Sequence, residues 1–422
     1  MRRADLTYEM GRASALRQRR RLVRVAAVAV QIAVAGLAAL WAAGVAPVWG
    51  QEEGVQAQSA ATYAFGQNLR FSLRAKSVEE ISGATLFFNT PEMSGTFAVD
   101  FELEPAREVT LEHEVALTQV QLAPFTTVRY WWRLNTDGGA RMVDEQMLAY
   151  VDDRFQWQEL SGDGIDVYWT GSDSSLGQAA LDVIAAVRPQ LKTVLPVDIA
   201  PVRVYVYPSM ADLRSALRLT GRDWLGAEAM PELGVVLVTA VNPRTAALDL
   251  GQSIPHELSH LLLYRATGAQ YESVPRWFDE GLATNVEMTP DAGNRGLLRE
   301  AIAGQATIPI AQLCATFPAS ESDVRLAYAQ SAALVQYMRN EYGTQALREL
   351  VAAYADGAGC DGGVRRVLGI SMEELEMHWL ARERPVSPMA QFLRMNGLWV
   401  ALAGGGFLIM GLLLIPLRRE RR

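Results

Sequence analysis

The amino-acid sequence predicts an α+β protein in which strands precede most of the helices. Residues 68–150 alternate apolar and polar side chains with period two, which is typical of strands with one buried face. Residues 165–240 mix β-branched runs with a helical stretch, and beyond residue 248 the apolar spacing is helical almost throughout. Because the strand-like and helix-like parts follow one another, the pattern favours the α+β class.

The chain has the composition of a folded protein. It contains 422 residues, of which 50% are hydrophobic and 20% are charged. At a typical domain size of about 100–200 residues, this length accommodates two or three domains. The formal net charge of −8 argues against a nucleic-acid partner, since binding to phosphates needs a basic face.

The first folded part is predicted over residues 63–155 as an antiparallel β-sandwich of the immunoglobulin or fibronectin type. Proline or glycine turns separate five expected strands, at residues 69–75, 84–90, 96–104, 109–117 and 127–135. His113 falls in the fourth strand, where the alternation makes it an ordinary strand residue. The sequence of this part contains no catalytic cluster and no feature that identifies a binding partner.

The second folded part is predicted over residues 160–385, with a mixed sheet followed by helices. Strands are expected at residues 165–169, 202–207 and 234–240, and helices near residues 176–195, 249–267, 292–304, 324–341, 344–355 and 371–383. The strand at 234–240 has two interpretations. It is either an edge strand that receives an extended peptide, or an interior strand, as its continuous apolar run equally indicates.

Two long apolar segments lie near the ends of the chain. Eight arginines precede the first segment, so residues 1–50 are predicted to be a signal peptide or an uncleaved signal anchor. The second segment, residues 398–417, is long enough to cross a bilayer and is predicted to be a transmembrane helix. Arginines dominate the tail at 418–422, so the positive-inside rule predicts a cytoplasmic tail and an extracytoplasmic body. The expected protein therefore lies in the cell membrane, with one span or with two if the N-terminal segment is retained.

The only two cysteines are Cys314 and Cys360. Outside the membrane they are free to pair as a disulfide. Two unpaired buried thiols are the alternative, and the sequence leaves both open.

One motif carries chemistry. Residues 254–263 read Ile-Pro-His-Glu-Leu-Ser-His-Leu-Leu-Leu, which places His256 and His260 four residues apart on one face of a helix. Two imidazole nitrogens at this spacing reach a single metal ion, and Glu257 between them is placed to act as a general base toward a metal-bound water. A catalytic zinc ion needs a third protein ligand.

The residues that follow resemble those of a known family. Trp277-Phe-Asp-Glu280-Gly-Leu-Ala comes 17 residues after His260 and is similar to the W-x-x-E-G-x-A segment of gluzincin metallopeptidases, which follows HExxH. The resemblance implies a zincin-like fold, a Zn2+ cofactor and Glu280 as the third ligand. Asp279 is the rival ligand by position, or else a carboxylate that supports a ligand. Together with Tyr328-Ala-Gln-Ser, these segments resemble the membrane-associated peptidase MA-like family of bacteria, in which a β-sandwich often precedes the protease domain.

The resemblance also implies roles for further residues. Gluzincins use a tyrosine or histidine to stabilise the oxyanion, and Tyr328 is the candidate, with a core aromatic as the alternative. His378 is expected on a helix surface. Thr284 and Asn285 are nominated as hydrogen-bond partners of the two histidines. The aminopeptidase branch carries a G-x-M-E-N motif, which residues 226–230 (Gly-Ala-Glu-Ala-Met) do not match, so an endopeptidase is expected.

The sequence therefore predicts a membrane-anchored, extracytoplasmic zinc metallopeptidase that hydrolyses peptide or protein substrates. A catalytically inactive cell-surface binding protein is the alternative, in which the sandwich binds a partner and the protease-like part is a scaffold. The four predicted groups at the metal site are all present, which favours the enzyme.

Overall fold

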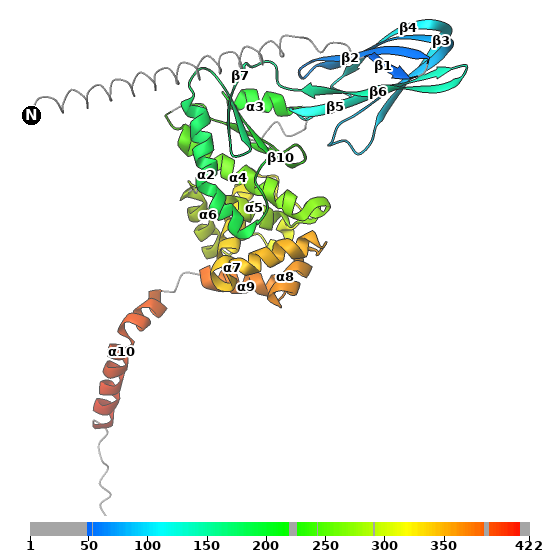
Figure 1. The fold of residues 1–422 in the computed structure, drawn as a ribbon. Coiled ribbons are helices and arrows are strands. Elements are labelled where there is room, and N and C mark those ends of the chain that lie inside the picture. The colour runs from blue at the N-terminus through cyan, green and yellow to red at the C-terminus, as the bar shows by residue number, and fades with distance from the viewer. Residues whose placement is uncertain are drawn as a thin grey trace, which may run out of the picture. The chain divides into compact units, whose positions relative to one another are not determined.

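The computed structural model describes residues 49–52, 54–218, 226–242, 244–289, 292–383 and 388–413 (Figure 1). The chain divides into two compact units. The N-terminal unit contains residues up to 120 together with 127–149, and the C-terminal unit contains 121–126 and everything from 150 onward. The predicted signal segment, apart from its last two residues, and the basic tail at 418–422 lie outside the described residues.

The N-terminal unit is built on one antiparallel sheet. Its strand order is β1-β2-β3-β5-β6, and β4 pairs with β3. The strands are β1 (Trp49–Glu52), β2 (Val55–Ala64), β3 (Asn68–Asn89), β4 (Phe97–Ala116), β5 (Thr126–Thr136) and β6 (Gly139–Tyr150). β2 pairs with the first half of β3 and β5 pairs with its second half, so β3 belongs to both halves of the sheet.

The predicted two-sheet sandwich is therefore corrected to a single sheet. Four of the expected strands merge into β3 and β4, and register shifts interrupt β3 between Lys76 and Gly83. In a straight strand Phe71 and Phe88 would lie about 56 Å apart, yet their rings stack with centroids 5.2 Å apart. The strand thus folds back at the shifts and encloses an apolar core with Trp132. Pro105 does not end β4, because β4 is an edge strand and tolerates a missing N–H.

The C-terminal unit contains a five-stranded sheet in the order β10-β11-β9-β8-β7. Its strands are β7 (Trp157–Gly162), β8 (Ile165–Thr170), β9 (Val202–Tyr207), β10 (Glu228–Met230) and β11 (Val235–Thr239). β9 is parallel to β8 and β11, whereas β7 and β10 are antiparallel edges. The expected strand at 234–240 is therefore interior, and the short β10 is the edge beside it.

Apart from α2 (Ser175–Val194) and α3 (Met210–Leu217), which lie between strands, the helices follow the last strand of the sheet, as predicted. They are α4 (Ala246–Thr267), α5 (Arg276–Val286), α6 (Ala292–Ala303), α7 (Glu321–Ala355), α8 (Cys360–Leu368), α9 (Met372–Glu383) and α10 (Pro388–Leu413). The 3-10 turns are η2 (Pro231–Leu233), η3 (Gly268–Ser273) and η4 (Ile310–Leu313). The two helices expected at 324–341 and 344–355 are the arms of α7, which breaks at Gly343 with φ of 81°. The short helices α3 and α8 were not predicted.

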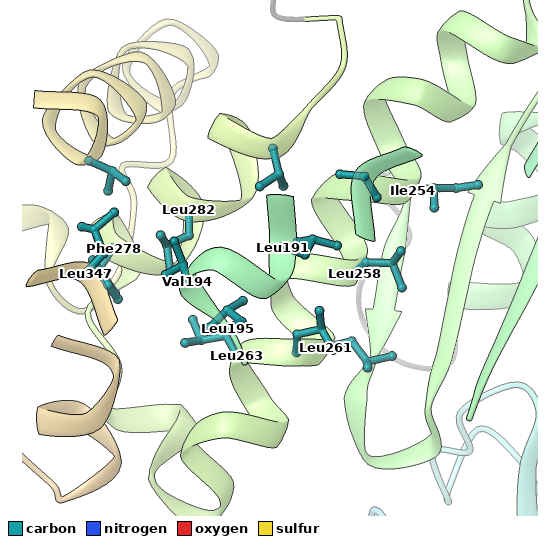
Figure 2. Close-up of a cluster of buried hydrophobic side chains, with 14 of the residues drawn as sticks. Leu191, Val194, Leu195, Ile254, Leu258, Leu261, Leu263, Phe278, Leu282 and Leu347 are labelled. Atoms are coloured by element: carbon teal, nitrogen blue, oxygen red, sulfur yellow. The ribbon is translucent and has the colours of Figure 1, made fainter. Parts of the chain in front are cut away.

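Leucine-rich faces of four helices form the core beneath the motif. Figure 2 shows side chains from α2, α4, α5 and α7 meeting in one buried cluster, among them Leu191, Val194, Leu195, Ile254, Leu258, Leu261, Leu263, Phe278, Leu282 and Leu347. α4 is buried on several sides, so the two histidines it carries are held by a rigid element rather than a loop.

Arg265 fixes the C-terminal end of α4. Its guanidinium donates hydrogen bonds to the carbonyl oxygens of Asp198, Ile199 and Pro201, at 2.8, 2.7 and 2.6 Å. A cation in the last turn is also favourable beside the negative end of the helix dipole. These contacts tie α4 to the loop that enters β9.

Cys314 and Cys360 form a disulfide, which is one of the two alternatives that the sequence left open. Cys314 follows η4 and Cys360 begins α8. The bond lies at the start of α5, because the backbone N–H of Arg276 donates to the Cys314 carbonyl at 2.8 Å and the Trp277 indole N–H lies 3.3 Å from Cys360 Sγ.

The predicted span at 398–417 lies partly in α10, which ends at Leu413. Residues 414–417 are outside the described residues. Within the described part of the chain, no helix combines the length and the apolar character needed to cross a membrane.

Candidate metal centre

The motif forms one turn in the middle of α4. His256 and His260 lie on the same helix face, with ring centroids 4.9 Å apart. Pro255 is accommodated inside the helix directly before them. His260 is buried and His256 is only slightly exposed, so both side chains lie inside the protein rather than in open solvent.

Helix α5 brings Glu280 to the two histidines. Glu280 Oε2 lies 3.2 Å from His256 Nε2 and 3.6 Å from His260 Nε2. The ligand atoms of the three residues all lie within 4.8 Å of one another, which suits one metal ion. The three ligands predicted from the sequence thus meet at one point.

The Glu280 carboxylate supplies a test of whether a metal fits. Glu280 is 1% exposed, and its Oε2 is a buried oxygen that makes no hydrogen bond with acceptable geometry to any described residue. A buried carboxylate oxygen without a partner is costly. Two imidazole nitrogens and one carboxylate oxygen are the donor set of a catalytic zinc site, so the residues present fit that ion.

Carboxylates orient both imidazole rings. His256 Nδ1 lies 2.9 Å from Glu287 Oε1, and His260 Nδ1 lies 2.6 Å from Asp279 Oδ1. Because an ionised carboxylate only accepts hydrogen bonds, each Nδ1 donates its proton and each Nε2 is left for a metal. Asp279 is therefore a supporting carboxylate rather than the rival ligand.

The nominated partners Thr284 and Asn285 do not fill this role. The Asn285 amide donates to the carbonyl oxygens of Gly281 and Ala332, both at 2.8 Å. The buried Thr284 hydroxyl has no hydrogen-bond partner among the described residues. Glu287 was missed. It is the C-cap residue directly after α5, seven positions beyond Glu280, and this spacing alone does not identify His256 as its partner.

A second hydrogen bond supports Asp279. The Tyr271 hydroxyl donates to Asp279 Oδ2 at 3.1 Å, and Asp279 itself is 4% exposed. A chain of hydrogen bonds thus runs from the partly buried Tyr271 through Asp279 to His260. It fixes the ring orientation of a metal ligand from outside the site.

Glu257 is buried beside the edge strand β10. Its carboxylate accepts a hydrogen bond from the backbone N–H of Ala229. Burial raises the pKa of Glu257, and the neighbouring histidines and the Ala229 N–H only partly offset this. A carboxylate with a raised pKa is suited to accept and return a proton.

Tyr328 lies at the site, on α7. Its hydroxyl donates to Glu280 Oε1 at 3.2 Å, and its ring centroid is 6.3 Å from that of His256. Burial raises the pKa of Tyr328, and the Glu280 carboxylate raises it further. The tyrosine is therefore a neutral donor, close to the three predicted ligands.

At the site, groups of opposite charge outweigh the effect of burial on the pKa values of Glu280 and the two histidines. Burial opposes ionisation of Glu280, but His260, His256 and Arg276 outweigh it and lower the pKa of Glu280 to about 2. Burial likewise lowers the pKa of His256, yet Glu280 and Glu287 overcome it and leave that pKa well above its ordinary value. The pKa of His260 is also raised, because Asp279 and Glu280 outweigh burial.

The other two histidines lie elsewhere. His113 is in β4, where its ring contacts Phe101 edge-on with centroids 5.7 Å apart. His378 is exposed on α9. Both placements agree with the predicted strand position of His113 and helix-surface position of His378.

Residues 185–383 match the model of the Peptidase MA superfamily. Over this range the chain is similar to the Peptidase MA superfamily. The matched range contains His256, Glu257, His260, Glu280 and Tyr328, so all the predicted site residues lie within it. The resemblance to peptidase MA-like gluzincins is confirmed.

Solved structures give weaker likenesses. Yeast LTA4 hydrolase in complex with Bestatin matches with 11% identity and a TM-score of 0.35, over 81% of this chain and 63% of that one. Bacteroides uniformis beta-glucuronidase 2 matches with 10% identity and a TM-score of 0.16, over 50% and 32%. The chain spans about three fifths of the length of the first structure and one third of the second. No curated protein matches the chain.

Proposed function

We propose that the chain is a membrane-anchored, extracytoplasmic zinc metallopeptidase that cleaves peptide bonds within a polypeptide. The observation that carries the proposal is the meeting of three ligand atoms within 4.8 Å beside the buried Glu257 carboxylate. A superfamily of peptidases provides the substrate class.

His256, His260 and Glu280 would hold the zinc ion through His256 Nε2, His260 Nε2 and Glu280 Oε2. When bound, the ion supplies a water of lowered pKa and polarises the scissile carbonyl. Glu257 accepts the proton of the attacking water and returns it to the leaving nitrogen. The neutral Tyr328 hydroxyl would exchange its hydrogen bond to Glu280 Oε1 for one to the oxyanion that develops on the carbonyl oxygen.

The edge strand β10 is placed to align the substrate. Its residue Ala229 contacts Glu257 through the backbone N–H, so a peptide paired with this edge would present a bond to the general base. The Ala229 side chain carries no charge that could hold a free amino terminus, which supports cleavage inside a chain rather than removal of terminal residues.

The proposed anchor is the C-terminal apolar segment. Large apolar side chains are exposed on the described part of α10, including Phe392, Met395, Leu398, Trp399 and Leu402. Arginines dominate residues 418–422, and on the positive-inside rule they stay in the cytoplasm. Loss of residues 388–422 should release the protein from a carbonate-washed membrane fraction, and retention there would contradict this anchor.

The test of the activity uses full-length protein purified in detergent. Wild type should bind about one zinc ion per chain and cleave a peptide library. Glu257→Gln should keep the zinc and lose cleavage, whereas His260→Ala should lose both. Glu373→Gln, at an exposed position of α9, is the matched control and should behave as wild type.

The alternative, an inactive binding protein, gives a different result. It predicts no cleavage by the wild type after zinc loading, with or without bound metal. Cleavage that survives in Glu257→Gln would contradict the assigned general base.

A further inference from the structure

Arg276 is the cation at the metal centre. It is the first residue of α5, one helical turn before Glu280. Its guanidinium lies 2.5 Å from Glu280 Oε1 and 3.6 Å from Asp279 Oδ2. Asp279 and Glu280 are both buried, whereas the Arg276 side chain is 45% exposed, so the arginine reaches inward from the rim.

The two oxygens of Glu280 have different surroundings. Oε1 faces two donors, the Arg276 guanidinium and the Tyr328 hydroxyl. Oε2 has no hydrogen bond to a described residue and faces the Nε2 atoms of both histidines. The two oxygens of the carboxylate therefore have separate roles. Oε1 is held by donors of the protein, and Oε2 is directed at the metal position.

We propose that Arg276 is a positioning residue that occupies Glu280 Oε1 and so restricts Glu280 to a single oxygen as a metal ligand. This inference rests on the proposed metal site. A carboxylate that used both oxygens would fill a coordination position that a catalytic zinc ion keeps for water or substrate. Arg276 thus keeps that position open.

The chemistry of arginine suits this role. Its planar guanidinium remains charged and carries several donors, so it holds Glu280 and lies beside Asp279 at the same time. An arginine stays protonated in folded proteins, so the cation does not leave Oε1 by losing a proton.

The backbone of Arg276 is anchored as well. Its N–H donates to the carbonyl oxygen of Cys314, which the disulfide joins to α8. The preceding Pro275 provides no side-chain cap for α5, so this contact satisfies one of the free N–H groups of the first turn. The backbone position from which the guanidinium extends is therefore fixed.

An ordinary surface ion pair four residues apart on a helix contributes little to stability, because solvent screens it, and it fixes the direction of no other group. Arg365–Asp361 on α8 is such a pair, with both side chains about half exposed. The Arg276 pair differs because its carboxylate is 1% exposed and belongs to a predicted ligand. This contrast supplies a matched control.

The experiment replaces zinc by Co(II) in the full-length protein and records the visible d–d spectrum, which reports coordination number. Arg276→Met removes the donor to Oε1 and keeps an unbranched side chain. Its Co(II) absorbance should fall as Glu280 binds through both oxygens, and kcat should fall about tenfold. Arg276→Lys keeps a cationic donor and should restore the spectrum. Arg365→Met should match wild type.

Each outcome decides the inference. A methionine variant with the wild-type spectrum overturns it, as does a lysine variant that fails to restore the spectrum. Circular dichroism checks that each variant is folded. Should Arg276→Met not fold, Tyr328→Phe removes the other donor to the same oxygen and should change the spectrum in the same direction. Wild type that binds no Co(II) or zinc defeats the proposed function itself, which is a distinguishable result.

Discussion

At the residue scale, Asp279 controls the orientation of His260. We expect Asp279→Ala to weaken zinc binding by about 10–100-fold, because the ring loses its hydrogen bond and Nε2 its fixed direction. Zinc affinity is measured by competition with a chelator of known affinity. Asp356→Ala, which breaks the exposed ion pair with Arg366, should leave the affinity unchanged. Equal affinities in the two variants would remove Asp279 from the site.

Protons and zinc compete for the two histidines. The pKa of His256 and that of His260 are raised in the metal-free protein, and zinc binds only to the deprotonated Nε2. Zinc affinity should therefore decline as the pH falls through these raised values, beginning above the ordinary histidine pKa of about 6.5. Glu280, with its pKa of about 2, stays ionised throughout. Zinc titrations at a series of pH values, with proton release measured in parallel, check this. An affinity that is flat down to the ordinary pKa contradicts it.

The sequence predicted the three ligands and offered Asp279 as a carboxylate that supports one of them, but it did not predict Glu287. His256 and His260 share one helical turn, so local geometry alone brings them together, and Glu280 follows from a motif. The contact of Glu287 with His256 joins residues 31 apart in sequence and depends on how α5 packs against α4. No local pattern determines that packing. The sequence therefore did not identify Glu287 as the partner of His256, and the nomination of Asn285 was wrong.

At the element scale, the contact between α5 and α7 requires a glycine. An added Cβ at Gly281 would lie 2.6 Å from the Ser331 carbonyl oxygen and 2.6 Å from a methyl carbon of Val335. Gly281→Ala should therefore destabilise the C-terminal unit by about 1–3 kcal/mol through overpacking, despite the better helix propensity of alanine.

Gly296→Ala on α6 is the matched control. A Cβ there meets nothing within 4 Å, so the substitution should stabilise by up to about 1 kcal/mol. Urea unfolding of both variants gives the comparison. Equal stabilities would mean that α5 and α7 move apart at little cost.

Elements with a strong period were the ones predicted best. α2, α4 and β9 agree with expectation to within a few residues, because their apolar faces are buried along their whole length. β3 and β4 were each predicted as two strands, since the shifts near Ile81 are set by pairing with neighbouring strands. β10 has three residues, which are too few to show a periodic pattern of apolar side chains.

At the scale of the whole molecule, the disulfide stabilises one unit and leaves the other as an internal reference. Cys314 and Cys360 both lie in the C-terminal unit, and their separation of 46 residues closes a long loop. On the chain-entropy estimate, Cys314→Ser with Cys360→Ser should cost about 4 kcal/mol. The N-terminal unit contains neither cysteine.

Denaturant unfolding of zinc-free protein separates these effects. Amide hydrogen exchange read by mass spectrometry follows peptides of each unit separately at each denaturant concentration. The double variant should shift the transition of peptides around Trp277, which lies 3.3 Å from Cys360 Sγ, to lower denaturant. The transition of peptides from the N-terminal unit should stay in place. A parallel shift of both transitions would mean that the two units unfold as one cooperative body, and the disulfide would then stabilise the entire chain.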